Sequence, residues 1–350
     1  MQLADVPGVT EGFSGTQGNA WLTTWAIAWL MDAEPGLVAR LRESGVDLPT
    51  LPSRTEVTPE LMTAATRWPP ALDLLLRAGP AAPGYDAASA VARRLGSALG
   101  ALVVTLVTGP ARIRAQRPDW PSGRWSAWAA VQRIMLGGGT IRGELGHLLV
   151  SEAQEVVDLS GVGVTVHRAP EPESLVLRGV AATVGDGVAI DCGGTNLKAS
   201  RVRHGRPVGG VQVIPSPGRV SADDVLDTIV RSLLPLLVPG AEIVPVALAL
   251  ATYVDETGQP YDNQLGVYAP LGHVEIQSAF AKAVARHTDR RLAPVFVHDG
   301  AAALAGARLT DPRADAAVVL GTAIGSGLTI PLEPRRSGPP GGTPPGERRW

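Results

Sequence analysis

The segment GVAIDCGGTNLK, residues 187–198, does most to decide the fold. A short apolar run ends at Asp191, and the paired glycines Gly193 and Gly194 follow it. Glycines that come directly after a strand expose backbone N–H groups to a phosphate, because no side chain blocks the approach. An acidic residue at the end of the strand can hold a hydrated magnesium ion. We therefore predict a phosphate-binding turn here, with Mg²⁺ bound to Asp191 through water.

The polar residues of the same segment extend this prediction. Thr195 and Asn196 offer side-chain hydrogen bonds to phosphate oxygens, and Lys198 either adds a positive charge or is a solvated strand residue. The alternative for the whole segment is an ordinary hairpin turn. An acid followed by GGTN favours nucleotide binding over that alternative.

Two further glycine-rich turns also follow short apolar strands. The first is LGTAIGSG, residues 320–327, which contributes Gly321, Thr322 and Gly325 as candidate nucleotide contacts. The second is the run Gly137, Gly138 and Gly139. Each has a plainer explanation, since glycines also serve flexible strand connections and close helix–strand packing.

Apolar runs and helical periods alternate along most of the chain, which is typical of an α/β protein. Besides a helical N-terminal region, we expect helices at 87–107, from the glycine run to about 157, and at 222–237, 274–287 and 300–309. We expect strands at 131–136, 162–166, 187–191, 197–203, 207–214, 244–251, 294–297 and 316–320. Residues 64–84 and 109–124 are rich in Pro, Gly and Arg and are predicted loops, and residues 332–350 are a predicted disordered tail.

Composition narrows the class of protein. The chain has 350 residues, of which 45% are hydrophobic, and a formal net charge of −2, so two domains with a large core fit and nucleic acid or an anionic membrane is not an expected partner. Cys192 is the single cysteine, which excludes an internal disulfide and a multi-cysteine metal site. The first twenty residues show no secretory pattern, and we expect a cytoplasmic protein.

Together these segments resemble the ROK and bacterial glucokinase-like sugar kinases, a branch of the hexokinase/actin/Hsp70 ATPase fold. Residues 191–196 match the D-x-G-G-T-N/K motif of that family, and residues 320–327 match its L-G-T-G-I-G-x-G motif with Ala323 in place of one glycine. The stretch VFVHDGAAAL, residues 295–304, resembles the strand and alanine-rich helix that carry the family's N-D pair. The resemblance implies a catalytic base at Asp299, and it places His298, a candidate substrate contact, where the family has Asn.

The resemblance also implies where the acceptor binds. Asn263 stands before Pro270-Leu271 as the family's sugar-contacting asparagine does, and Asp262 beside it could bind acceptor hydroxyls. An Asp-Asn pair is equally ordinary in turns. Asp299 itself has the alternative role of a helix cap, and both roles can hold at once.

The motifs occur in an unusual order. Residues 90–110, the IMLGGG stretch at 134–139 and residues 170–182 resemble segments that follow the second phosphate motif in the family, yet here they precede the first. We therefore predict an actin-like, ribonuclease H-like fold of two domains that is circularly permuted. Residues 1–182 with 315–330 would form the nucleotide-side domain, residues 187–312 would form the domain with the first phosphate motif and the acceptor site, and Thr183–Gly187 would link them.

The resulting expectation is an ATP- and Mg²⁺-dependent kinase that phosphorylates a hydroxyl of a sugar-like small molecule. The alternatives are a catalytically silent sugar-binding regulator and an ATPase coupled to a partner. The family's three-cysteine zinc motif is absent, so no structural zinc is expected.

Three features of the sequence remain outside this account. Glu144 and His147 spell the family's G-E-x-G-H motif, but in a place where a surface or packing helix is the plainer explanation. The stripe of Trp21, Trp25 and Trp29 is expected in the core or at a homodimer interface rather than as a sugar platform. His273 either caps its helix or faces the cleft.

Overall fold

The computed structural model describes residues 3, 22–43, 45–51, 61, 64–117, 120, 122–218, 220–237, 242–255, 257–262 and 267–329. The predicted tail and Asn263 lie outside these residues. Within them the α-helices are α2 (Thr24–Asp32), α3 (Pro35–Glu43), α5 (Trp68–Arg77), α6 (Tyr85–Thr108), α7 (Ala111–Arg114), α8 (Ser122–Ala129), α9 (Gly143–Ser160), α10 (Leu175–Ala181), α11 (Ala222–Leu233), α12 (Ile276–His287) and α13 (Asp299–Arg308). Short 3₁₀ helices are η1 (Gly139–Ile141), η2 (Pro172–Ser174), η3 (Leu234–Leu236) and η4 (Ala269–His273).

The strands are β1 (Arg133–Gly137), β2 (Thr165–Arg168), β3 (Gly187–Cys192), β4 (Asn196–Arg203), β5 (Arg206–Pro215), β6 (Ile243–Leu250), β7 (Tyr253–Val254), β8 (Pro260–Asp262), β9 (Arg291–His298), β10 (Ala316–Leu320) and β11 (Ile324–Leu328). The expectation of an α/β protein with mixed sheets is confirmed. In the described part of the chain the strands form a four-stranded sheet β11-β10-β1-β2, a five-stranded sheet β5-β4-β3-β6-β9 and the small ribbon β7-β8.

The four-stranded sheet repeats the arrangement of four strands of the five-stranded sheet, in which β5 has no counterpart. In the five-stranded sheet, β3 pairs antiparallel with β4 and parallel with β6, and β6 pairs parallel with β9. In the four-stranded sheet, β10 pairs antiparallel with β11 and parallel with β1, and β1 pairs parallel with β2. The strands of the four-stranded sheet, read in the order β10, β11, β1 and β2, therefore correspond to β3, β4, β6 and β9. In the chain itself β1 and β2 come before β10 and β11, so the correspondence requires the reading to start at β10.

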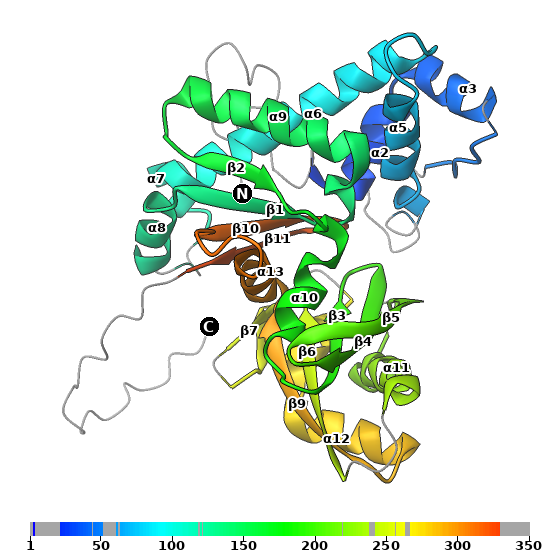
Figure 1. Cartoon of the computed structure of the whole chain (residues 1–350), viewed down its shortest axis with the longest axis vertical. Helices are drawn as coiled ribbons and strands as arrows, with labels where there is room; N and C mark the ends of the chain where they lie inside the picture. Colours follow the sequence, from blue (N-terminus) through cyan, green and yellow to red (C-terminus); the bar gives the residue numbers. More distant parts are fainter. Residues whose placement is uncertain are drawn as a thin grey trace, which may run out of the picture.

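The sheets lie in separate lobes, with α10 and α13 between them (Figure 1). Helix α10 packs mainly on β3 and β6 of the five-stranded sheet, and α13 packs mainly on β10 and β11 of the four-stranded sheet. Where they cross, glycines permit backbone contact, since a Cβ on Gly179 would lie 1.7 Å from the carbonyl oxygen of Ala302. A single buried cluster joins Leu175, Val180, Ala302 and Ala307 to both sheets.

The helical N-terminal region packs on the first lobe. Helices α2, α3 and α5 share one core with α6, α9, β1 and β10. Gly96 and Gly100 stand one turn apart on α6 and let α9 approach closely, because a Cβ at either position would collide with α9. Helix α6 is long and apolar enough to cross a membrane by composition alone, but 78% of its apolar window is buried in the protein, as in the core helix of a soluble protein.

Several sequence predictions were wrong. The predicted loop 64–84 contains α5, which begins with prolines at its first turn and buries a leucine face, and the predicted loop 109–124 contains α7 and the start of α8. Both predictions were wrong because they took a high content of proline and glycine as evidence for a loop. The predicted helix 222–237 ends at Leu233 and continues as η3, where Pro235 interrupts the α-helical pattern.

Candidate nucleotide and acceptor site

Three hydrogen bonds to the backbone of Gly193 fix the first glycine turn. The backbone N–H of Gly193 donates to the carbonyl of Asn196 over 3.1 Å, which closes the turn between β3 and β4. The carbonyl of Gly193 accepts from the hydroxyls of Ser216 at 2.6 Å and Tyr268 at 2.8 Å. Burial raises the pKa of Tyr268 well above its usual value, so its hydroxyl stays protonated and keeps donating. The turn is thus preorganised by groups that a ligand need not supply.

The second glycine turn faces the first. It is shorter than predicted, because Ile324–Leu328 forms the strand β11 against β10 and only residues 321–323 connect the strands. The hydroxyls of Thr195 and Thr322 are hydrogen-bonded to each other across the gap between the turns. A Cβ on Gly194 would lie 3.4 Å from that of Thr322. Both turns link a central strand to its antiparallel neighbour, so they occupy equivalent positions in the two sheets.

The third glycine turn lies beside the second. Gly137 is in register with Val319 on the adjacent parallel strand. Gly138 has a φ of +98°, and a Cβ there would lie 2.1 Å from the carbonyl oxygen of Leu320. Only glycine combines that backbone conformation with so close an approach. Three turns far apart in the sequence therefore converge on one region between the lobes.

Two buried carboxyl groups adjoin this region. Asp191, near the end of β3, lies 3.4 Å from the ammonium of Lys198, which also donates to the carbonyl of Glu173 at 2.7 Å. Asp299 begins α13, accepts from the N–H of Gly300 at 2.6 Å, and would lie 3.0 Å from a Cβ on Gly325. Burial raises the pKa of Asp191; the charge of Lys198 lowers it in part, and that of Asp299 raises it further.

Asp299 has the most perturbed carboxyl of the site. Burial raises its pKa from 3.8 to about 7, against the smaller opposing effect of the Gly300 N–H. His298 Nε2 lies 3.1 Å from the Asp299 carboxylate, and burial together with the charge of Arg124 lowers the pKa of His298 to about 4. The imidazole is therefore neutral at pH 7, so its contact with the Asp299 carboxylate is not an ion pair. His298 also precedes α13 without a side-chain cap, so Asp299 is not the N-cap that the sequence suggested.

The residues present fit a hydrated Mg²⁺. No cluster of three or more His, Cys, Asp or Glu side chains that could enclose an ion occurs among the described residues. Burial is the main cause of the raised pKa of Asp191, and repulsion from the charge of the nearby Asp299 adds to it. A cation that keeps most of its water and shares its charge with phosphates would relieve that repulsion.

Other predicted residues are less well placed or lie outside the described part. Asp262 ends β8 in register with Tyr253, but its side chain is outside the described residues, as is Asn263. Asn196 begins β4, and its carbonyl closes the first turn. His273 is exposed at the end of η4 and does not cap α12, whose N-terminus is capped by Glu275.

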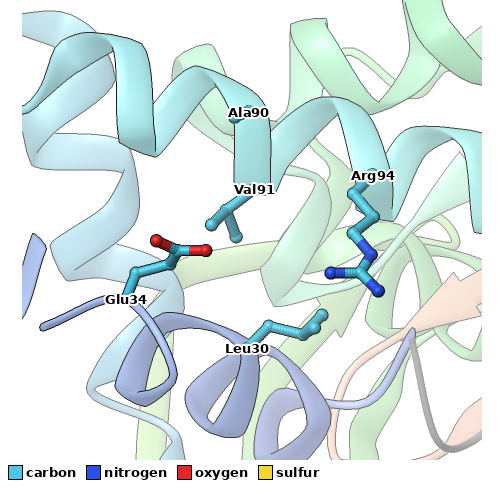
Figure 2. A pocket seen from close by; sticks show the side chains of 5 residues that line it. All are labelled: Leu30, Glu34, Ala90, Val91 and Arg94. Atoms are coloured by element: carbon cyan, nitrogen blue, oxygen red, sulfur yellow. The ribbon is translucent and has the colours of Figure 1, made fainter.

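The remaining predicted features lie on α9 and α2. Glu144 and His147 are exposed on the first turns of α9, and the nearby carboxylate of Asp73 accepts from the N–H of Leu145 at 3.0 Å. Trp25 and Trp29 meet edge to face with ring centroids 4.9 Å apart, and Trp25 packs against the first core; Trp21 lies outside the described residues. A small pocket between α2 and α6, lined by Leu30, Glu34, Ala90, Val91 and Arg94, contains no predicted site residue (Figure 2).

Sequence reasoning missed the residues that surround His298. Tyr253 stacks on the imidazole, and Arg117 and Arg124 lie over the Tyr253 ring. Both arginines belong to the segment that was predicted to be a loop. Nothing in its composition pairs it with a strand more than a hundred residues later, so no sequence signal could have placed them there.

No protein-family model and no curated protein matches this chain.

Proposed function

We propose that this protein is an ATP- and Mg²⁺-dependent kinase that transfers a phosphoryl group to a hydroxyl of a small metabolite. The observation that carries the proposal is the convergence of three glycine turns beside Asp191 and Asp299. Backbone N–H groups of such turns suit the phosphates of a nucleotide. The threonine pair Thr195 and Thr322 adds hydroxyls at the point where the turns meet.

The proposed chemistry follows from the charges of the site. Bound Mg²⁺ would neutralise charge on the β- and γ-phosphates, and Asp191 would hold it through water. Asp299 would accept the proton of the acceptor hydroxyl as that oxygen forms its bond to the γ-phosphorus. The bond to the β–γ bridging oxygen then breaks, and ADP is the leaving group. A carboxyl with a pKa of about 7 is half ionised near neutral pH, which suits a general base.

The arrangement of strands supports a circularly permuted actin-like fold as part of this proposal. The strands of the four-stranded sheet match β3, β4, β6 and β9 in order only when that sheet is read from β10 through β11 to β1 and β2. A chain whose former ends were joined near Thr183–Gly187 would have this order. The predicted domain limits remain part of the proposal.

The Asp299→Asn variant tests the function. The variant keeps the shape of the side chain but removes the base, so we expect turnover to fall by about 10²–10⁴-fold while Mg·ATP still binds. Turnover is measured as ADP release with a panel of sugars, sugar acids and polyols, and binding by calorimetry. Asp289→Asn, at an exposed position, is the matched control and should behave as wild type. Near-native turnover of Asp299→Asn would exclude Asp299 as the base.

A further inference from the structure

A stack of aromatic and guanidinium groups adjoins His298 through the ring of Tyr253. The imidazole stacks on Tyr253 with ring centroids 4.7 Å apart and planes inclined by 18°. The guanidinium carbons of Arg124 and Arg117 lie 5.5 and 5.9 Å from the centre of the Tyr253 ring. The same two carbons lie 5.1 and 4.6 Å from the Trp120 ring, so the arginines are held between two aromatic faces.

Two members of this stack, Arg124 and Trp120, have donor groups that no described residue of the protein satisfies. Arg124 is half-buried, and it forms no ion pair with a carboxylate among the described residues. The indole N–H of Trp120 is buried and has no hydrogen-bond acceptor among the residues that the structure describes. A guanidinium stacked on rings keeps its N–H donors at its edge, where they can bind a carboxylate or phosphate in a bidentate manner. Unsatisfied donors grouped around a fixed positive charge suit an anionic ligand.

The position of the stack relates this ligand to the acceptor. Under the proposed function Asp299 contacts the acceptor hydroxyl, and His298 links Asp299 directly to the stack through a 3.1 Å contact. The ring contacts of the stack run to β7 and the end of β9, whereas the nucleotide turns lie at β3, β10 and β1. An acceptor that extends from Asp299 along His298 would reach the arginines with its far end.

We propose that the acceptor is an anionic metabolite, whose hydroxyl lies at Asp299 and whose carboxylate or phosphate is bound by Arg124 with the help of Arg117. This inference rests on the proposed kinase function. Arg124 then determines which acceptor is used and takes no part in the transfer itself. Carboxylates and phosphates both supply an anionic group at a distance from the reacting hydroxyl. The experiment below decides which of the two the acceptor carries.

The test compares neutral acceptors with anionic ones of similar size, in wild type and in variants. D-Glucose is set against D-gluconate and D-glucose 6-phosphate, and glycerol against glycerate and glycerol 3-phosphate. We expect an anionic member to be phosphorylated with a higher kcat/KM than its neutral partner. Whether the carboxylates or the phosphates respond identifies the anionic group. Arg124→Gln should raise KM for that acceptor by about 10- to 100-fold, the loss expected for hydrogen bonds to a charged group, and leave KM for Mg·ATP unchanged.

Two further variants separate binding from folding. Arg112→Gln removes a neighbouring exposed arginine on α7 and should leave every constant unchanged. Arg124→Lys keeps the charge but loses the planar donor edge, so its KM should lie between those of wild type and Arg124→Gln. The KM of Arg124→Gln is interpreted only if its Tm equals that of wild type. If the Tm of Arg124→Gln is lower, the KM of Arg124→Lys is compared with wild type instead.

Three results would overturn the inference. One is preference for a neutral acceptor; another is an Arg124→Gln effect that falls on KM for Mg·ATP. The third applies if no acceptor is turned over: calorimetry with Mg·ADP present would then show no binding of any anionic probe to wild type. In each case normal Mg·ATP binding leaves the kinase proposal standing, whereas absent Mg·ATP binding would mean that the proposed function itself has failed.

Discussion

Asp299 joins three properties that seldom occur together at one carboxyl group. Its side chain is only 16% exposed, its carboxylate lies 3.1 Å from the ring nitrogen of a neutral histidine, and its pKa is raised to about 7 by burial. A buried carboxyl without a cationic partner is costly to ionise, and proteins keep such groups mainly where they act. At the residue scale, the proposed chemistry therefore depends on the desolvation of this one side chain.

The raised pKa predicts how activity depends on pH. A general base must be ionised, so kcat/KM for the acceptor should rise about tenfold per pH unit below the pKa and level off above about 7. Initial rates from pH 5 to 9 at saturating Mg·ATP measure this. Asp299→Asn should lose the rising limb, and a profile in wild type that is already flat from pH 5 would contradict the assignment.

The same shift has a consequence for stability, and its sign is fixed. The folded pKa lies above the unfolded value of 3.8, so the folded state binds the additional proton between about pH 4 and 7. The stabilisation is complete below the unfolded pKa and is lost as the pH rises through about 7. Asp299→Asn should therefore show a weaker fall in unfolding free energy over this interval, in urea titrations at several pH values.

At the scale of elements, the site depends on strand ends that meet. Strands β10 and β1 are parallel neighbours, so the turns that follow them leave the same edge of the sheet. The turn between β3 and β4 belongs to the other sheet, and the Thr195–Thr322 hydrogen bond connects the two sides. Gly138, directly after β1, approaches the backbone of Leu320 at the end of β10 so closely that a Cβ would not fit, and this makes it the position to alter.

Gly138→Ala should damage both stability and nucleotide binding. The new Cβ would collide with the carbonyl of Leu320, and a non-glycine residue at φ +98° costs about 1–3 kcal/mol before that collision is counted. Gly139→Ala is the matched control, because a Cβ there would meet nothing within 4 Å. Denaturant midpoints and Mg·ATP affinity measure the difference. Equal behaviour of the two variants would refute the close approach of the turns.

The sequence was a good guide to some of these elements and a poor guide to others. Strands with a continuous apolar run, such as β3 and β10, were predicted within a residue, and the long helix α6 within two, because burial on both faces leaves a clear local pattern. Strand β11 was missed since its glycines look like a loop in isolation, although Gly327 fits against the backbone of Gly300 and Gly325 against the carboxylate of Asp299. The short ribbon β7-β8 has too few residues for a period.

The site could be predicted only where motifs are local. The DCGGTN turn and the HD pair carry their chemistry within a few residues. The arginine stack could not be found, because Arg117 and Arg124 lie more than a hundred residues before Tyr253 and meet its ring only in the folded chain. Pairing of this kind follows from the fold and leaves no pattern in the sequence.

At the scale of the molecule, two sheets of equivalent arrangement enclose a pair of crossing helices. The segment from Thr183 to Gly187 connects the halves on the surface, where Thr183, Gly185 and Asp186 are exposed. Its contacts are modest: the carbonyl of Gly185 and the carboxylate of Asp186 accept from the β4–β5 turn. A joint between former chain ends would have this character.

If this segment is such a joint, the protein should tolerate a break within it. We expect fragments 1–185 and 186–350, expressed together, to co-purify as one complex, because β10 and β11 of the second fragment complete the sheet of the first. A cut after Arg201, inside β4, should prevent assembly. Assembly is measured by affinity purification through a tag on one fragment. Recovery of the tagged fragment alone from the 185/186 cut would contradict the permutation.

The most direct test of the central claim is a calorimetric titration of the intact protein with ATP, with and without Mg²⁺. If the three glycine turns and Asp191 form one nucleotide site, one molecule of ATP binds per chain, more tightly with Mg²⁺ present, and Gly138→Ala weakens this binding while Gly139→Ala does not. An absence of heat with Mg·ATP under conditions where the protein is folded would contradict the account.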